Sequence, residues 1–431
     1  MKKLKIDNIF IFLSLLFILG CCIYYGTRLI YFYKIENPKI EKNETLYETI
    51  LQDKTLEKKE NIIYYKGKEV YNYLEYSGRI FRILSITKDG YAKLITEENQ
   101  TSLVWGYNQE YENSYIRSWL NDDDNEYRSF IQSLKNTNGI IVTNNTFSDI
   151  LKDDKVIANK EVKDKAGLVS LYEYELSGGA NGFLNNGKSF WTSNKDESDN
   201  IYYIYKTGKV IKDYNQIIGV RPTITINTKI SNFSGQGTKN NPFKIEFDQG
   251  KKLKDKYVGE YIKLDNDVYR IIESYDDYIK VSSEVMNERT FGNSSYYSVN
   301  ENIGKYINTM LINNFKYKNL ILTGIFNTGK YDLTNYFDFN DSASYQEKAK
   351  IGLLNIGELF LEDDDNYFLG SRPITTKKKV YQMNKDGLIL GKDIKEKSGI
   401  KLTFHLDSEL LVSTGTGSKK DPYIVREWYC E

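Results

Sequence analysis

Acidic residues form the densest clusters of side chains that could do chemistry. Asp122, Asp123 and Asp124 lie together before Asn125-Glu126, and a second acidic cluster spans 362–366. Carboxylate oxygens at this density are ligands that calcium prefers. The spacing is not that of an EF-hand loop, and the two clusters stand at non-equivalent places in the chain. We therefore favour solvated loops, with a calcium site as the alternative.

Tryptophans and arginines supply the candidate ligand-binding residues, which are Trp105, Arg117, Trp119, Trp191 and Arg221. An indole ring can serve as a platform for a sugar, and a guanidinium can hold an anionic ligand. The alternative is packing, because the neighbours of Trp119 and Trp191 follow the pattern of buried elements. Trp105 lies in a loop-like stretch before Gly106, and we expect its side chain to be the exposed one.

Nucleophilic catalysis finds little support in the composition. His405 is the only histidine in 431 residues, and the three cysteines are Cys21, Cys22 and Cys430. Cys–His, Ser–His and His-rich metal sites are therefore nearly excluded. A hydrolase that uses a carboxylate pair stays open, because Asp and Glu are abundant. We expect no catalytic residue and no cofactor.

Charge balance argues against nucleic acid as a partner. Lys+Arg and Asp+Glu both total 59, so the formal net charge is zero. Non-specific binding of nucleic acid depends on a basic excess, which this chain lacks.

The elements that position these residues occur twice. The run 219–222 and the turn around Gly237 recur as 399–402 and around Gly417, and 399 − 219 and 417 − 237 both give 180. This constant offset predicts two tandem domains, 63–248 and 249–431. The Gly-x-Gly runs could cradle a phosphate, but no helix pattern follows them. A structural turn before a short strand is therefore the favoured interpretation.

Local patterns predict hairpins, a capped helix and closing strands in each domain. Strand-like runs flank the turns at 88–90, 207–208, 276–277 and 386–387. Ser114 is a suitable N-cap for a helix that carries Trp119 and Leu120. Alternation over 403–406 predicts that Phe404 and Leu406 face inward and His405 outward. These elements together predict α+β domains with irregular middle segments.

The first apolar run predicts a membrane anchor. Residues 8–27 carry no charge and are long enough to cross a bilayer, and the lysines at positions 2, 3 and 5 favour an amino terminus inside. We expect a cytoplasmic tip and transmembrane anchor over 1–34 and a stalk over 35–62. The expected anchor residues are Ile9, Phe10, Leu13, Leu16, Phe17 and Leu19. The alternative is a cleaved lipoprotein signal, because 18–21 resembles a lipobox ending at Cys21.

The motifs around Trp119, Trp191 and Arg221 resemble an uncharacterised domain family of surface and secreted proteins from low-G+C bacteria. Its pattern is a Ser-x-x-Arg-x-Trp-Leu-Asn helix, a Trp-containing strand and a terminal Gly-Val-Arg-Pro strand, matched here at 114–121, 190–193 and 219–222. That family is distantly similar to C-type-lectin-like and formylglycine-generating-enzyme-like domains. The second copy departs from the pattern, since Lys401 and Leu402 replace the Arg-Pro pair.

These observations predict an α+β protein with one N-terminal transmembrane helix followed by two tandem C-type-lectin-like repeats, the second degenerate. We expect a single-pass cell-membrane protein with extracellular domains. We expect it to act as a non-enzymatic surface binding or adhesion module whose first repeat carries the ligand. A glycan, cell-wall or protein ligand is the expected partner, besides the membrane. The alternatives are a cell-surface hydrolase or modifying enzyme and a structural spacer or sensor ectodomain.

Overall fold

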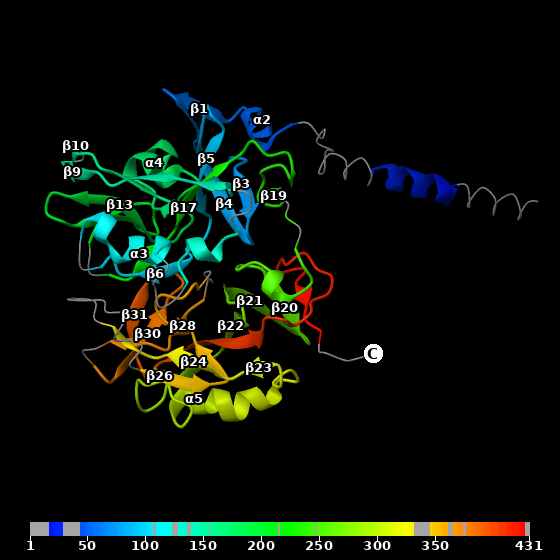
Figure 1. The fold of residues 1–431 in the computed structure, drawn as a ribbon, viewed down its shortest axis with the longest axis vertical. Coiled ribbons are helices and arrows are strands. Elements are labelled where there is room, and N and C mark those ends of the chain that lie inside the picture. The colour runs from blue at the N-terminus through cyan, green and yellow to red at the C-terminus, as the bar shows by residue number, and fades with distance from the viewer. Residues whose placement is uncertain are drawn as a thin grey trace, which may run out of the picture.

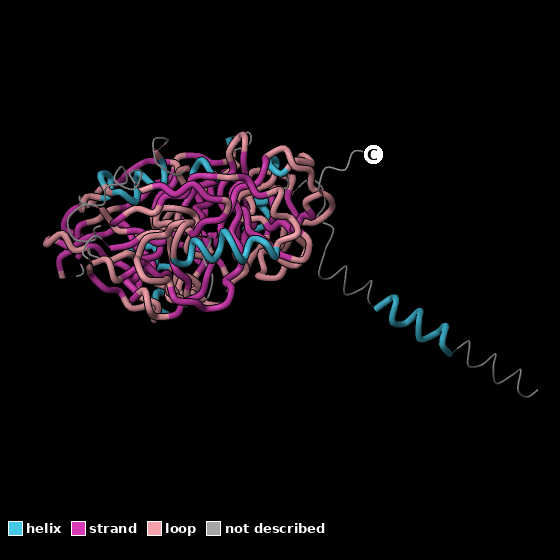
Figure 2. The backbone as a smooth tube through the Cα atoms, turned by 90° about the horizontal axis from the view of Figure 1, so that it is seen from below, coloured by secondary structure: helices cyan, strands magenta, loops and turns pink. Residues whose placement is uncertain are grey.

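The computed structural model describes residues 17–28, 44–106, 109–122, 128–135, 139–153, 155–213, 216–245, 247, 249–331, 345–360, 365–373 and 376–426. Strands account for 42% of the structure and helices for 16%. Strands run through the whole body of the molecule in Figure 2, and one longer helix, over residues 302–314, crosses it among shorter helical pieces. The expected α+β class is therefore wrong, because strands dominate the structure and most of the helical patterns in the sequence form only one or two turns.

Most helices of the two repeats end within two turns, and the exception is the second repeat's segment 302–314, in which three helical pieces follow one another without a break. The α-helices are α2 (Leu46–Leu51), α3 (Tyr115–Asn121), α4 (Leu171–Leu176) and α5 (Asn302–Tyr306). The 3-10 helices are η1 (Tyr111–Asn113), η2 (Ile131–Ser133), η4 (Gly179–Asn181), η5 (Leu253–Asp255) and η7 (Ile312–Asn314), and η6 (Ile307–Leu311) is a π-helix.

The expected transmembrane helix is not supported. Among the described residues, no helix has both the length and the apolar character that crossing a membrane requires. The described part of this segment, residues 17–28, is helical. Phe17 and Leu19 are exposed on this stretch. Ile9, Phe10, Leu13 and Leu16 lie outside the described residues.

The first repeat is built on two sheets (Figure 1). The main sheet has the order β12 (Ala166–Gly167), β17 (Thr223–Asn227), β5 (Tyr91–Thr96), β4 (Arg79–Thr87), β3 (Tyr73–Tyr76), β19 (Phe243–Ile245) and β18 (Phe233–Ser234), with β1 (Leu56–Lys59), β2 (Ile62–Tyr65) and β7 (Ile141–Val142) joined to it. The other sheet contains β10 (Lys155–Ala158), β9 (Ile150–Lys152), β13 (Phe190–Asp196), β14 (Ile201–Ile204), β15 (Val210–Lys212), β16 (Ile218–Val220) and β6 (Thr101–Leu103). A separate pair joins β8 (Asn144–Phe147) to β11 (Glu161–Asp164).

The second repeat combines the corresponding strands in one sheet. Its order is β31 (Ile389–Asp393), β30 (Lys379–Met383), β28 (Tyr367–Phe368), β32 (Lys397–Asp407), β22 (Tyr278–Thr290), β21 (Asp267–Ser274), β20 (Tyr261–Leu264) and β33 (Tyr423–Ile424), with β23 (Ile321–Leu322) and β27 (Ile351–Leu353) on β32. Two further pairs are β24 (Gly324–Asn327) with β26 (Gln346–Ala349) and β25 (Lys330–Tyr331) with β29 (Arg372–Pro373).

Strand register repeats between the two parts of the chain. Gly219 lies opposite Phe190 in a parallel pair, and Gly399 lies opposite Tyr367 in a parallel pair. The strands that follow Pro242 and Pro422 both join their repeats in parallel, β19 on β3 and β33 on β20. The two repeated motifs therefore occupy corresponding places in two copies of one strand arrangement.

Proline explains why the first repeat has two sheets and the second has one. Pro222 has no N–H and separates β16 from β17, whereas β32 runs without a break through the corresponding Leu402. The Leu402 N–H donates to Ser283 Oγ at 2.9 Å. The replacement of the Arg-Pro pair by Lys401 and Leu402 thus allows one long strand.

The local predictions hold for the turns and caps. The strands around all four predicted hairpin turns pair antiparallel. Ser114 Oγ accepts the Arg117 N–H at the start of α3, as predicted. Gly237 and Gly417 have positive φ angles of 73° and 74°, and a strand, not a helix, follows each turn. This geometry belongs to a structural turn.

The predicted orientation of His405 is wrong. Phe404 and Leu406 are buried as expected, but His405 is only 6% exposed. The hairpin of β24 and β26 covers the outer side of β32, so that Phe326 stacks on the imidazole with ring centroids 5.1 Å apart. Alternation predicted a solvated face, and a second layer of strands covers that face.

Candidate functional site

The tryptophans expected to bind ligand lie in the core of the first repeat. Trp191 is fully buried, and its indole N–H donates to the Leu103 carbonyl at 2.9 Å. Trp105 packs edge-on against it with ring centroids 5.7 Å apart. Trp105 is 1% exposed, so the expected exposure of this residue is wrong. Its loop folds inward because neighbouring rings, Tyr111 among them, surround the indole.

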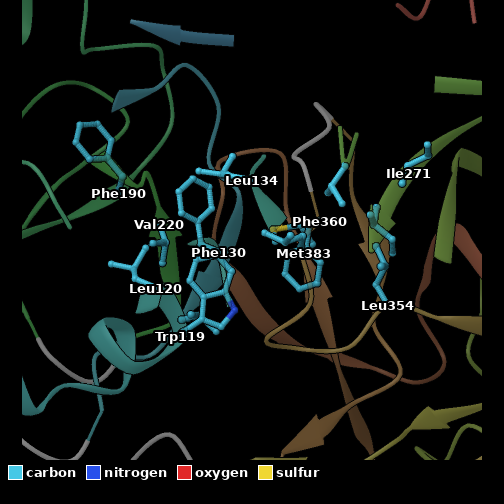
Figure 3. Close-up of a cluster of buried hydrophobic side chains, with 14 of the residues drawn as sticks. Trp119, Leu120, Phe130, Leu134, Phe190, Val220, Ile271, Leu354, Phe360 and Met383 are labelled. Atoms are coloured by element: carbon cyan, nitrogen blue, oxygen red, sulfur yellow. The ribbon is translucent and has the colours of Figure 1, made fainter. Parts of the chain in front are cut away.

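Trp119 joins the two repeats. Its ring stacks on Phe130, and its indole N–H donates to the Gly357 carbonyl of the second repeat at 2.7 Å. Figure 3 shows these two rings on one side of the junction, with Phe360 and Met383 of the second repeat on the other. Burial of this mixed cluster gives the repeats an apolar contact.

The two candidate arginines bind groups of the first repeat itself. Arg117 forms a two-pronged ion pair with Asp164, with N–O distances of 2.7 and 2.8 Å, and this pairing raises the pKa of Arg117. Arg221 is fully buried and donates to the carbonyls of Thr96 and Leu184. Lys401 occupies the corresponding place in the second repeat, where its amine lies over the Tyr367 ring. Arg221 is therefore enclosed in the core, whereas the Arg117 side chain is partly exposed and is held by Asp164.

The acidic cluster shows no metal site in its described part. Asp122 is the C-cap of α3, and Asp123 and Asp124 lie outside the described residues. Within the residues that are described, no group of three or more His, Cys, Asp or Glu side chains is placed to hold a metal ion.

A polar groove runs along the junction of the repeats. It consists of two adjoining cavities of about 290 and 690 Å³, which share Ile80, Glu98, Tyr261, Arg270 and Lys419. Its lining includes residues of β3, β4 and β19 from the first repeat and of β20 and β21 from the second. We call it the inter-repeat groove.

Corresponding residues of the two repeats line the larger cavity. Tyr73 begins β3 and Tyr261 begins β20, and Glu97 and Glu284 stand at corresponding places in the β4–β5 and β21–β22 hairpins. Lys239 and Lys419 come from the two Gly-x-Gly turns, and 419 − 239 gives 180. The duplicated elements thus bring the same three side-chain types to both sides of one groove.

Each groove tyrosine carries an arginine on its ring. Arg82 pairs with Tyr73 across β3 and β4, and its guanidinium carbon lies 3.8 Å from the ring centroid. Arg270 pairs with Tyr261 in the same register, at 5.2 Å. Arg82 is bound to Glu97 at 3.2 Å and Arg270 to Glu98 at 3.3 Å. These ion pairs keep the rings in place at the groove wall.

The one histidine lies outside the groove in a dry environment. Burial, followed by the charge of nearby Lys280, lowers the pKa of His405 to about 3. Lys280 forms a buried ion pair with Glu358, and Phe326 lies between this pair and the solvent side of the strand. A neutral, covered imidazole is poorly suited to general base catalysis on a bound ligand.

Sequence reasoning missed the groove and selected core residues instead. Aromatic and arginine side chains serve packing as well as binding, and the residue type alone does not distinguish the two roles. The available signal was the repeat itself, since Lys239 and Lys419 stand at the same position of the repeated turn.

No protein-family model, curated protein or solved structure matches the chain. The resemblance to a bacterial surface domain family and to C-type-lectin-like domains therefore stays a prediction.

Proposed function

We propose that this protein is a non-enzymatic binding protein whose ligand lies in the inter-repeat groove. The observation that carries the proposal is the duplicated lining by Tyr73 and Tyr261, Glu97 and Glu284, and Lys239 and Lys419. Equivalent groups on the two sides of a groove suit an elongated ligand that presents the same groups along its length. Tyrosine rings and charged side chains bind hydroxyl-rich units by stacking and hydrogen bonding. A glycan polymer of the cell wall or cell surface is the ligand of this kind that we propose.

The proposed function places the ligand between both repeats, whereas the sequence-based expectation placed it on the first repeat alone. Trp105, Trp119, Trp191 and Arg221 are buried and occupied by contacts of the fold. A groove ligand would instead contact exposed Lys239 and Lys419 and the partly exposed tyrosines. Neither repeat would then bind at full strength without the other.

A glycan and cell-wall-fragment binding screen of the full chain tests this proposal. Replacing both Lys239 and Lys419 with Ala should weaken binding about tenfold or more, since each charged hydrogen bond contributes about 1.5–3 kcal/mol. The matched control replaces Lys58 and Lys348, which are equally exposed but lie outside the groove. Equal weakening by both double variants would contradict the groove assignment. Turnover of any wall polymer would contradict the non-enzymatic role.

A structural spacer or sensor ectodomain is the second candidate. It is favoured by the burial of the motif tryptophans and by the contacts that Trp119 makes across the junction. A chain that binds no ligand in the screen, while both repeats remain folded, would support this candidate.

An extracellular location belongs to the same proposal. The cysteine pattern is compatible with it, because only Cys430 lies beyond the first apolar run and a surface protein of this composition would fold without disulfides. Recovery of the native protein only from the cytoplasm of fractionated cells would exclude it.

A further inference from the structure

Arg79 is a buried cation that has no carboxylate partner in the part of the chain that the structure describes. Its side chain is 2% exposed, and its Nη2 donates to Ser133 Oγ at 2.8 Å. Its Nε and Nη1 atoms have no hydrogen-bond partner among the described residues. The guanidinium carbon lies 5.2 Å from the centroid of the Phe130 ring. An aromatic ring and one hydroxyl compensate only part of the cost of burying a charge.

The turn before Arg79 holds it against the second repeat. A Cβ on Gly78 would lie 2.9 Å from the Val258 carbonyl oxygen, and a Cβ on Gly259 would lie 3.0 Å from Arg79 Cγ. Both glycines therefore permit a close approach of the two repeats. The arginine has little freedom to turn toward solvent.

Arg79 and Arg270 line the same cavity of about 290 Å³. Burial, followed by the charge of Arg270, lowers the pKa of Arg79 to about 9. A buried guanidinium whose charged form is disfavoured by a neighbouring guanidinium is a poor arrangement for stability alone. It becomes favourable when an anion lies between or beside the two groups.

The acidic residues of this cavity already have partners. Glu75 is bound to Lys244 at 2.9 Å and Glu98 to Arg270 at 3.3 Å. Glu260 accepts hydrogen bonds from Gln249 and from the Tyr257 N–H, and its burial raises the pKa of its carboxyl. The cavity therefore keeps one guanidinium without a carboxylate of its own.

We propose that Arg79, with Arg270 beside it, binds an oxyanion in the inter-repeat groove, a carboxylate or a phosphate carried by the ligand. The inference rests on the proposed binding role of the groove and names the chemistry of the ligand. A uronic acid or another acidic sugar would supply a carboxylate, and a phosphodiester-linked polyol would supply a phosphate. The unpartnered N–H groups of Arg79 would donate to the oxyanion.

The experiment titrates the full chain, with 15N-labelled arginine, with sodium D-glucuronate and separately with inorganic phosphate. Sodium chloride at equal ionic strength and neutral D-glucose are the controls. The Nε–H resonance of Arg79 is assigned by its loss in Arg79→Lys. We expect this resonance to shift with one or both oxyanions and not with the controls. A preference between the two probes identifies the source of the oxyanion.

Variants separate a specific site from general electrostatics. Arg79→Met should weaken binding of the effective probe about tenfold or more. Lys244→Met removes one positive charge from the same cavity and should change the affinity less than about threefold. No oxyanion-dependent shift in the wild-type chain, or equal binding by Arg79→Met, would overturn the inference.

The two proposals can fail separately. A chain that binds a neutral glycan through Lys239 and Lys419 but shows no oxyanion effect would overturn the inference and leave the proposed function intact. A chain that binds an oxyanion at Arg79 but binds no polymer would overturn the proposed function and leave the inference intact.

Discussion

At the scale of single residues, burial decides what the charged and titratable side chains can do. His405 is the clearest case, because Phe326 and Tyr278 cover its ring and Lys280 stands nearby. The imidazole stays neutral in the folded protein down to a pH of about 3. In the unfolded chain it takes up a proton near pH 6.5.

This difference predicts an acid-sensitive stability. Below pH 6.5 the unfolded state binds one proton more than the folded state, so the free energy of unfolding falls as the pH falls toward 3. We expect the titration of His405 to lower the free energy of unfolding by about 1.4 kcal/mol for each pH unit between 6.5 and 3. Urea unfolding at pH 7.0 and 5.5 measures the loss.

His405→Gln is the control, because it removes the only histidine and leaves every carboxylate in place. Its unfolding free energy should depend less on pH between 7.0 and 5.5 than that of the wild type. The same dependence in both proteins would show that the imidazole titrates normally in the fold.

At the scale of elements, one buried ion pair is built twice. Glu173 closes the capping box of α4 with Ser170 and binds Lys93 of β5 at 2.6 Å. In the second repeat Glu358 accepts the N–H of Asn355 in the same way and binds Lys280 of β22. The start of α4 in the first repeat and a turn at the corresponding place in the second are thereby each tied to a central strand.

Removing the carboxylate charge should destabilise the second repeat more than the first. Glu358→Gln and Glu173→Gln keep a side chain that suits the capping box but leave a buried lysine unpaired. Breaking a buried pair costs about 3–5 kcal/mol. The side chains of Lys280 and Glu358 are 5% and 2% exposed, against 10% and 14% for Lys93 and Glu173. Urea unfolding of both variants measures the loss of unfolding free energy. Equal losses in the two variants would contradict this ranking.

At the scale of the whole molecule, the two repeats share a core and a set of polar contacts. Besides the Trp119 contact, Lys206 is bound to Asp386 at 2.8 Å, and the Ser189 N–H donates to the Asp386 carbonyl. Ile217 and Ile389 form a β-bridge between the repeats. Contacts of this kind favour a single cooperative unit over two independent domains.

Trp119→Ala should therefore lower hydrogen-exchange protection in both repeats. We expect the free energy of opening, measured at the slowest amides of β17 and also of β32, to fall by about 3–5 kcal/mol. This is the usual cost of truncating a buried aromatic side chain. Trp119→Phe keeps the ring contact with Phe130 and should cost less. Amides of β32 that keep full protection in Trp119→Ala would show that the repeats unfold separately.

Sequence alone determined the features that depend on neighbouring residues. The four hairpins, the Ser114 cap and the glycine turns follow from chemistry within a few positions of the chain, and all of them are present. The sequence also determined the offset between the two copies of the motif, because the residue numbers of corresponding turns and strands differ by a constant value.

Only the tertiary structure decided the features that depend on what covers a surface. The sequence predicted a solvated outward side for β32, but strands β24 and β26 cover His405 on that side. The sequence also predicted an exposed Trp105, which the core of the first repeat encloses. The groove joins Tyr73 to Tyr261 and Lys239 to Lys419, residues far apart in the chain. Periodicity reports which side of an element is apolar, and it contains no information on which distant element packs against that side.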